Sequence, residues 1–239
     1  TNAVAATVNE QKLADIELDK DIETVFEDTR VHALLAQSVP QINANQVHLA
    51  GVTGSGVKVC IVDTGVDDSH AAIAPLVGEY DFVNNDTDAM DDNGHGTHVA
   101  GIVASNDSVY KGVAPGASLM AAKVLDAFGS GWTSDVIAGI DWCVANGADI
   151  ISMSLGGAAY LGTCDSEPLA AASNNAVDQG AVVFAASGND GYLNAIATPA
   201  CGSKVIAVGA VNKKDGRTPY SNEGTKLDIV APGSEITST

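Results

Sequence analysis

Three short segments of the sequence place polar side chains where they could do chemistry. Asp63 closes the apolar run 57–62, His95 lies between two glycines, and Asn189 comes shortly after the apolar run 181–186. A carboxylate, an imidazole and an amide can accept, transfer and donate protons or hydrogen bonds. Taken singly, each also has an ordinary interpretation, because Asp and Asn are common in turns and His is common at surfaces. Their order and setting therefore matter more than their identity.

Other patterns resemble known sites but lack the required context. The glycines at 51, 54 and 56 precede an apolar run, whereas a dinucleotide-binding loop must follow a strand and open a helix. This position argues against a nucleotide-binding α/β domain. His95 and His98 lack the glutamate and the spacing of a zinc-protease helix. The run from Asn84 to Asp88 begins like an EF-hand, but Ala89 replaces the required glycine.

The elements that must position these residues alternate between apolar strands and helical segments. The predicted strands are 57–62, 119–125, 149–154, 181–186 and 205–211, and the predicted helices are 95–105, 133–146 and 168–179. This alternation predicts an α/β fold with a doubly wound, mainly parallel sheet and helices on both faces. In such a sheet, residues just past strand ends and at helix starts line the binding crevice.

Composition limits the classes of partner. The 239 residues are 46% hydrophobic and carry a net charge of -19, so a large core is possible and nucleic acid or an anionic membrane surface is disfavoured. No apolar run approaches the roughly 18 residues that a membrane span needs. Four cysteines do not define a compartment.

Together and in this order, the three segments resemble the subtilisin-like serine proteases, the subtilase family (peptidase family S8). The segments 112–117, 152–157 and 228–233 also resemble family segments, and the resemblance covers about residues 36–239. It implies an endopeptidase that hydrolyses peptide bonds with an Asp-His-Ser triad.

The resemblance also implies a role for each residue. Asp63 would orient His95, which would act as general base and then general acid, and Asn189 would donate a hydrogen bond to the oxyanion. The implied substrate-binding residues are Ser154, Leu155 and Gly156, which would pair with an extended peptide, and Ala186, Ser187 and Gly188, which would wall the first side-chain pocket. His98 would be structural.

The resemblance also implies what the first 35 residues are and which catalytic segment is missing. Residues 1–35 resemble the C-terminal part of a small α+β inhibitory propeptide, and residues 36–239 resemble a catalytic domain. The family's nucleophile lies in a Gly-Thr-Ser-Met-Ala-type segment, and no such segment occurs here; Ser234 and Ser238 lack that context. We expect a partial proform that is inactive alone. The alternative is a non-catalytic, subtilase-like peptide-binding module.

An acidic loop suggests a cation site. Residues 79–92 hold six acidic residues and no basic one, which is typical either of a solvated acidic loop or of a calcium site. The spacing of the oxygen-bearing residues also resembles a calcium loop of some subtilases. The predicted Ca²⁺ ligands are Asp81, Asn84, Asp86 and Asp88.

The cysteines divide into two pairs. Cys164 and Cys201 lie in loop-like segments and could form a disulfide, whereas Cys60 in a strand and Cys143 in a helix are expected to be buried thiols. The family resemblance further implies a secreted, extracellular, monomeric protein. Its partners would be polypeptide substrates and its own propeptide as intramolecular inhibitor, with no nucleic acid and no membrane.

Overall fold

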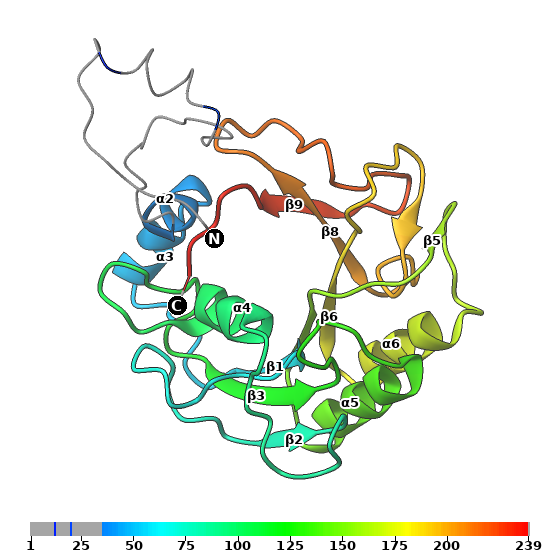
Figure 1. Ribbon diagram of the computed structural model, residues 1–239, viewed down its shortest axis with the longest axis horizontal. Helices are drawn as coiled ribbons and strands as arrows, with labels where there is room; N and C mark the ends of the chain where they lie inside the picture. The colour runs from blue at the N-terminus through cyan, green and yellow to red at the C-terminus, as the bar shows by residue number, and fades with distance from the viewer. Residues whose placement is uncertain (1–11, 13–19, 21–34, 239) are drawn as a thin grey trace. The chain divides into compact units, whose positions relative to one another are not determined.

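The structure is a computed structural model that describes Lys12, Lys20 and residues 35–238 (Figure 1). The chain divides into two units, Thr1–His32 and Ala33–Thr239, and the description below concerns the second. The predicted propeptide, residues 1–35, lies almost entirely outside the described residues. Its boundary therefore stays a prediction.

A seven-stranded sheet, in the order β2-β3-β1-β4-β6-β8-β9, forms the centre of this unit (Figure 1). All of its neighbouring strands pair in parallel. The strands are β1 (Lys58–Asp63), β2 (Glu79–Asp81), β3 (Ser118–Lys123), β4 (Ile150–Met153), β6 (Val182–Ala186), β8 (Ile206–Val211) and β9 (Ile229–Pro232). A separate antiparallel pair joins β5 (Ala159–Tyr160) to β7 (Ile196–Ala197).

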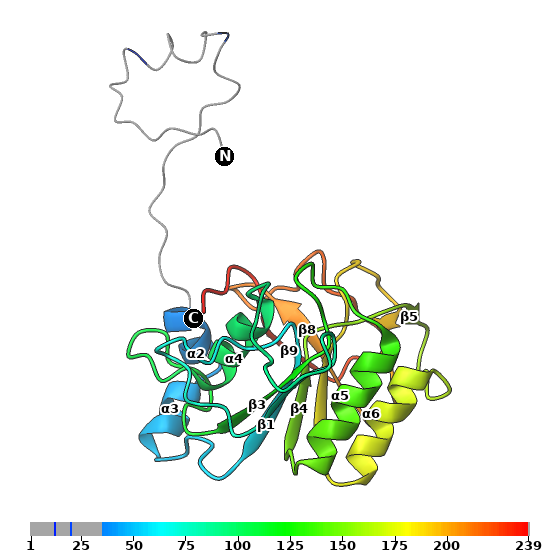
Figure 2. The same cartoon turned by 60° about the horizontal axis from the view of Figure 1, so that its bottom comes forward.

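Helices cover both faces of the sheet, as Figure 2 shows with α4 on one side and α5 and α6 on the other. The described helices are α2 (Leu35–Gln41), α3 (Ala44–Leu49), α4 (His95–Ala104), α5 (Thr133–Ala145) and α6 (Pro168–Asp178). None of the helices described in residues 35–238 has the length and hydropathy of a bilayer-spanning segment.

Strand β1 shows how one apolar run serves two cores. Cys60 and Val62 pack in the core beneath α5 and α6, whereas Val59 and Ile61 pack in the core beneath α4. Successive side chains of a strand point to opposite faces, so a strand covered on both faces must be apolar throughout. The prediction of a doubly wound, mainly parallel sheet with helices on both faces is confirmed.

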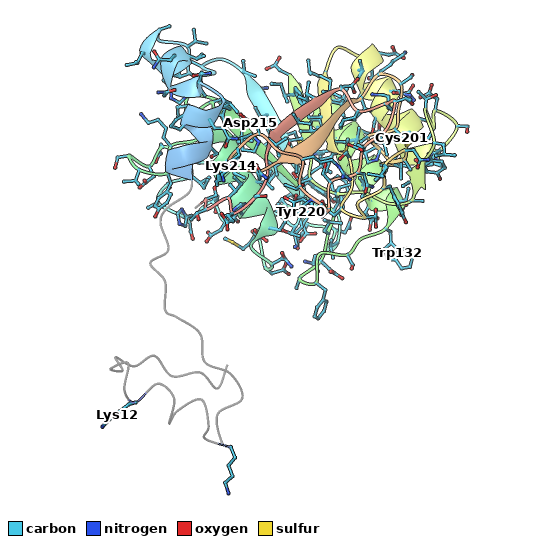
Figure 3. All side chains as sticks on the ribbon, turned by 90° about the horizontal axis from the view of Figure 1, so that it is seen from above. Lys12, Trp132, Cys201, Lys214, Asp215 and Tyr220 are labelled. Atoms are coloured by element: carbon cyan, nitrogen blue, oxygen red, sulfur yellow. A yellow bond between two sulfur atoms is a disulfide. The ribbon has the colours of Figure 1, made fainter. Side chains whose placement is uncertain are left out.

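Both cysteine pairs form disulfides. Cys164 bonds to Cys201, with Cα atoms 5.4 Å apart. Cys60 of β1 bonds to Cys143 of α5, so the expectation of two buried thiols was wrong. Both side chains are fully buried as expected, but α5 crosses β1 and brings their Cα atoms to 6.0 Å, within disulfide range. Cys201 is labelled in Figure 3.

Candidate active site

The structure brings Asp63 and His95 together, and we call these two residues the acid–base pair. Asp63 is the last residue of β1 and is fully buried, while His95 opens α4 with its side chain 48% exposed. His95 Nδ1 lies 2.6 Å from Asp63 Oδ1. Because a carboxylate only accepts hydrogen bonds, Nδ1 carries the proton and Nε2 is the nitrogen that can accept one. The pair can therefore act as an oriented general base.

Neighbouring groups raise the pKa of His95. The hydrogen bond that His95 donates to Asp63 is the largest influence and raises the pKa of His95 above its usual 6.5; partial burial opposes this rise, and the negative charges of Asp63 and Asp91 reinforce it. The backbone N–H of Thr64 also donates to Asp63 Oδ1, at 2.7 Å. The second oxygen, Oδ2, is buried without a hydrogen-bond partner. The carboxylate thus makes both of its hydrogen bonds through one oxygen.

Asp91, which was not among the predicted site residues, links the segment after β1 to the first turn of α4. Its Oδ1 accepts from Thr64 Oγ1 at 2.9 Å, and its Oδ2 accepts from the backbone N–H and the hydroxyl of Thr97 at 2.8 and 2.6 Å. Thr64 Oγ1 in turn accepts from the backbone N–H of Gly96 at 2.9 Å. One carboxylate therefore binds both Thr64, the residue after Asp63, and Thr97, the second residue after His95.

The same hydrogen bonds keep Asp91 ionised. Burial opposes its charge, but hydrogen bonds from Thr97, Gly94 and Asn93 outweigh burial, and the pKa of Asp91 is lowered. Asp91 lies four residues before the start of α4, and acidic residues favour helix N-termini. This position is the sequence feature that could have identified it.

Two glycines allow β1 and α4 to approach closely. A Cβ atom on Gly96 would overlap the carbonyl oxygen of Gly65. Gly65 itself has φ +104, and a Cβ there would overlap the carbonyl oxygen of Ala89. The glycine that follows His95 is therefore a packing requirement.

A buried lysine binds the segments that follow β1 and precede α4. Lys123, at the end of β3, is 1% exposed and pairs in register with Asp63. Its ammonium donates to Thr64 O and Asp92 Oδ1, both at 2.6 Å, and to Leu125 O at 3.0 Å. All three donors of this buried cation are used, as a buried charge requires.

His95 opens onto a cleft of about 570 Å³. The predicted peptide-pairing residues Ser154, Leu155 and Gly156 line the same cleft, directly after β4. Phe128, 90% exposed, lies on its wall. Trp132 borders a neighbouring hollow and projects from the surface in Figure 3. His95 and residues 154–156 therefore line one continuous cleft.

The remaining predicted residues lie around a second, smaller hollow. Ala186, Ser187, Gly188 and Asn189 line a space of about 180 Å³ at the end of β6. Asn189 is exposed, and its side chain has no hydrogen-bond partner among residues 35–238. The predicted pocket wall and the predicted oxyanion donor thus lie together, in a hollow separate from the cleft that His95 lines.

The predicted calcium ligands form a hydrogen-bonded loop. Asp81 is buried, and its Oδ1 accepts from the backbone N–H groups of Val83 and Asn84, while its Oδ2 accepts from the Asn84 side chain. Asp86 Oδ1 accepts from the backbone N–H of Asp88. Within the part of the chain that the structure describes, no three His, Cys, Asp or Glu side chains gather as a metal-binding group. Both carboxylate oxygens of Asp81 are therefore occupied by hydrogen bonds from the loop itself.

The raised pKa of His95 gives a direct prediction for the 239-residue chain. We expect its imidazole to titrate above 6.5, and the Asp63→Asn variant to titrate at lower pH, because the substitution removes the main cause of the rise. Proton NMR of the histidine ring signals across pH 5–9 measures both values. The His98 signal is the internal control, and an unchanged His95 midpoint in the variant would contradict the assignment.

Comparisons with known proteins find relatives over the whole chain. Residues 54–239 match the model of the Subtilase family. The chain is 44% identical to Subtilisin E of Bacillus subtilis over 248 residues, covering 100% of this chain and 63% of that relative. It is 44% identical to Subtilisin of Bacillus pumilus, covering 85% of this chain and 76% of that relative. The chain therefore spans less than two thirds of the length of Subtilisin E.

A solved structure shows the same fold. The crystal structure of a cold adapted subtilisin-like serine proteinase superposes with a TM-score of 0.70 at 38% identity, covering 78% of this chain and 66% of that chain.

Proposed function

Since the chain belongs to the subtilase family, we propose that the full-length protein is a serine endopeptidase that cleaves peptide bonds by acyl transfer. The observation that carries this proposal is the 2.6 Å contact between His95 Nδ1 and the buried Asp63 carboxylate, at a cleft of about 570 Å³ that His95 lines. A buried carboxylate and a half-exposed imidazole are the orienting group and the base of such a reaction.

The proposed mechanism assigns one proton path. A serine hydroxyl gives its proton to His95 Nε2 while its oxygen attacks the substrate carbonyl carbon. Asp63 holds the productive tautomer and stabilises the imidazolium that forms. His95 then gives the proton to the leaving amine, and water repeats the sequence to release the acyl group. Asn189 donates its amide N–H to the oxyanion of each tetrahedral intermediate.

The substrate is proposed to bind as an added strand. Residues 154–156 continue beyond β4 into the cleft, where their backbone groups can pair with an extended polypeptide. Ala186, Ser187 and Gly188 are small, so the hollow they line accepts a side chain, and this hollow is the proposed specificity pocket.

We further propose that the nucleophile comes from outside these 239 residues, because they contain no Gly-Thr-Ser-Met-Ala-type segment. A fluorophosphonate reagent should label the full-length protein at one serine and leave the 239-residue chain unlabelled. The His95→Ala variant of the full-length protein is the control and should label far more slowly. Stoichiometric labelling of any serine in the 239-residue chain contradicts the proposal. A full-length protein that binds peptides without labelling would support the non-catalytic module.

Secretion is part of the proposal. One relative, 36% identical over 259 residues, is named Minor extracellular protease Epr. Both described disulfides also suit an oxidising compartment. We place the protein outside the cell, as a monomer that residues 1–35 inhibit as an intramolecular propeptide before processing.

Calcium binding at residues 81–88 is proposed from charge alone. A cation would relieve the repulsion in this acidic loop, but it must displace the hydrogen bonds between Asp81 and Asn84. We expect millimolar Ca²⁺ to raise the Tm of the full-length protein, and the Asp86→Asn/Asp88→Asn variant to lose the rise. Asp141→Asn, on the exposed side of α5, is the matched control. An equal rise in both variants would place any calcium elsewhere.

A further inference from the structure

Asn222 is a buried amide that the mechanism above does not use. It follows β8 in the chain, lies 33 residues after Asn189 and is 0% exposed. A fully buried amide must find partners for its donors and its acceptor, or it destabilises the fold. The partners of the Asn222 side chain are Asp190 and Tyr192, which lie directly after Asn189 in the chain.

The side chain of Asn222 holds the backbone after Asn189. Its Oδ1 accepts from the backbone N–H of Asp190 at 3.0 Å and from that of Tyr192 at 3.1 Å. Its Nδ2 donates to Asp190 Oδ2 at 3.2 Å. Three hydrogen bonds from one amide thus restrain the loop immediately downstream of Asn189.

The backbone of Asn222 holds the residues before Asn189. Its N–H donates to Gly188 O at 3.0 Å, and its carbonyl accepts from Ser187 Oγ at 3.0 Å. Gly188 has φ +108, and a Cβ atom there would overlap Asn222 Nδ2. The glycine before Asn189 therefore leaves the space that the Asn222 amide occupies.

Asn189 itself needs such support. Its side chain is exposed and has no hydrogen-bond partner among residues 35–238, so contacts of its own do not orient it. An oxyanion donor must nevertheless be preorganised to within a fraction of an ångström of its working position. Because Asn222 binds residues 187 and 188 on one side and 190 and 192 on the other, it restrains the backbone on both sides of Asn189.

We propose that Asn222 is a positioning residue that fixes the backbone from which Asn189 donates to the oxyanion. This inference rests on the proposed endopeptidase function. It predicts that Asn222 acts on the rate only through the Asn189 amide. A merely structural residue would instead affect folding, substrate binding and rate without regard to Asn189.

A double-mutant cycle in the full-length protein tests this directly, with kcat and KM measured on a chromogenic peptide amide. Asn222→Ala should lower kcat by about 10- to 100-fold with little change in KM. Asn189→Ala should lower kcat by about 10²- to 10³-fold. In the Asn189→Ala background, the further effect of Asn222→Ala should shrink to less than about threefold.

The chain offers a matched control in Asn174 of α6. Asn174 is 8% exposed, donates to Asp165 and accepts from the backbone N–H of Lys204, so it repeats the bonding of Asn222 with partners outside residues 187–192. Asn174→Ala should lower Tm while leaving kcat within about twofold of wild type. If Asn222→Ala fails to fold, Asp190→Ala is the second variant. Asp190 is exposed, and its substitution removes the acceptor of the Asn222 Nδ2 hydrogen bond. This variant should show a smaller loss of kcat, and that loss should also vanish in the Asn189→Ala background.

The outcomes separate this inference from the proposed function. A wild-type protein without peptidase activity would overturn both. An active wild type in which the Asn222 and Asn189 effects simply multiply would overturn this inference alone. So would a kcat loss in Asn174→Ala equal to that in Asn222→Ala.

Discussion

Replacing Asp63 by asparagine should lower the kcat of the full-length protein on peptide substrates by about 10⁴-fold. The buried carboxylate accepts the hydrogen bond from His95 Nδ1 at 2.6 Å, and this bond keeps the proton off Nε2. An asparagine amide can donate to Nδ1 instead, which leaves Nε2 protonated and unable to act as base. The imidazolium would also lose its counter-charge.

The loss should appear in kcat more than in KM, because the interaction strengthens only as the imidazolium forms. Steady-state kinetics with a peptide amide measure both constants. Asp178→Asn, which breaks an exposed ion pair with Lys204, is the matched control and should remain within about twofold of wild type. A variant at Asp63 with more than a tenth of wild-type kcat would remove the acid–base pair from the mechanism.

Removing the disulfide between Cys60 and Cys143 should lower the free energy of unfolding by about 4 kcal/mol. The bond closes a loop with a sequence separation of 83, and its loss releases that restraint from the unfolded chain. Both cysteines are fully buried, so the Cys60→Ala/Cys143→Ala variant also loses packing between β1 and α5. Urea denaturation followed by circular dichroism measures the change.

The second disulfide provides the comparison. Cys164 and Cys201 have a sequence separation of 37, so the Cys164→Ala/Cys201→Ala variant should lose about 0.7 kcal/mol less through the chain-entropy effect. Equal denaturation midpoints for wild type and the Cys60→Ala/Cys143→Ala variant would show that the first bond does not stabilise the protein.

Several features were predictable because they depend on local patterns. The predicted helix 133–146 corresponds to α5 over Thr133–Ala145, and the predicted strand 181–186 corresponds to β6 over Val182–Ala186. Both have a periodicity or a continuous apolar run that one stretch of chain displays by itself. The two-residue strands β5 and β7 were not predicted, since a two-residue strand has no periodicity to detect.

The sequence by itself determined the family, the alternating α/β architecture and the side chains of the acid–base pair, because each resides in a contiguous segment. Only the tertiary structure decided that Asp91 joins Thr64 to Thr97, that Asn222 brackets Asn189, and that Cys60 bonds to Cys143. These contacts link residues as far as 83 positions apart. The type of one residue does not specify which distant residue it will contact. In a parallel sheet the crossover connections bring the ends of strands and the starts of helices to the same edge of the sheet. The packing at that edge then decides which polar groups meet.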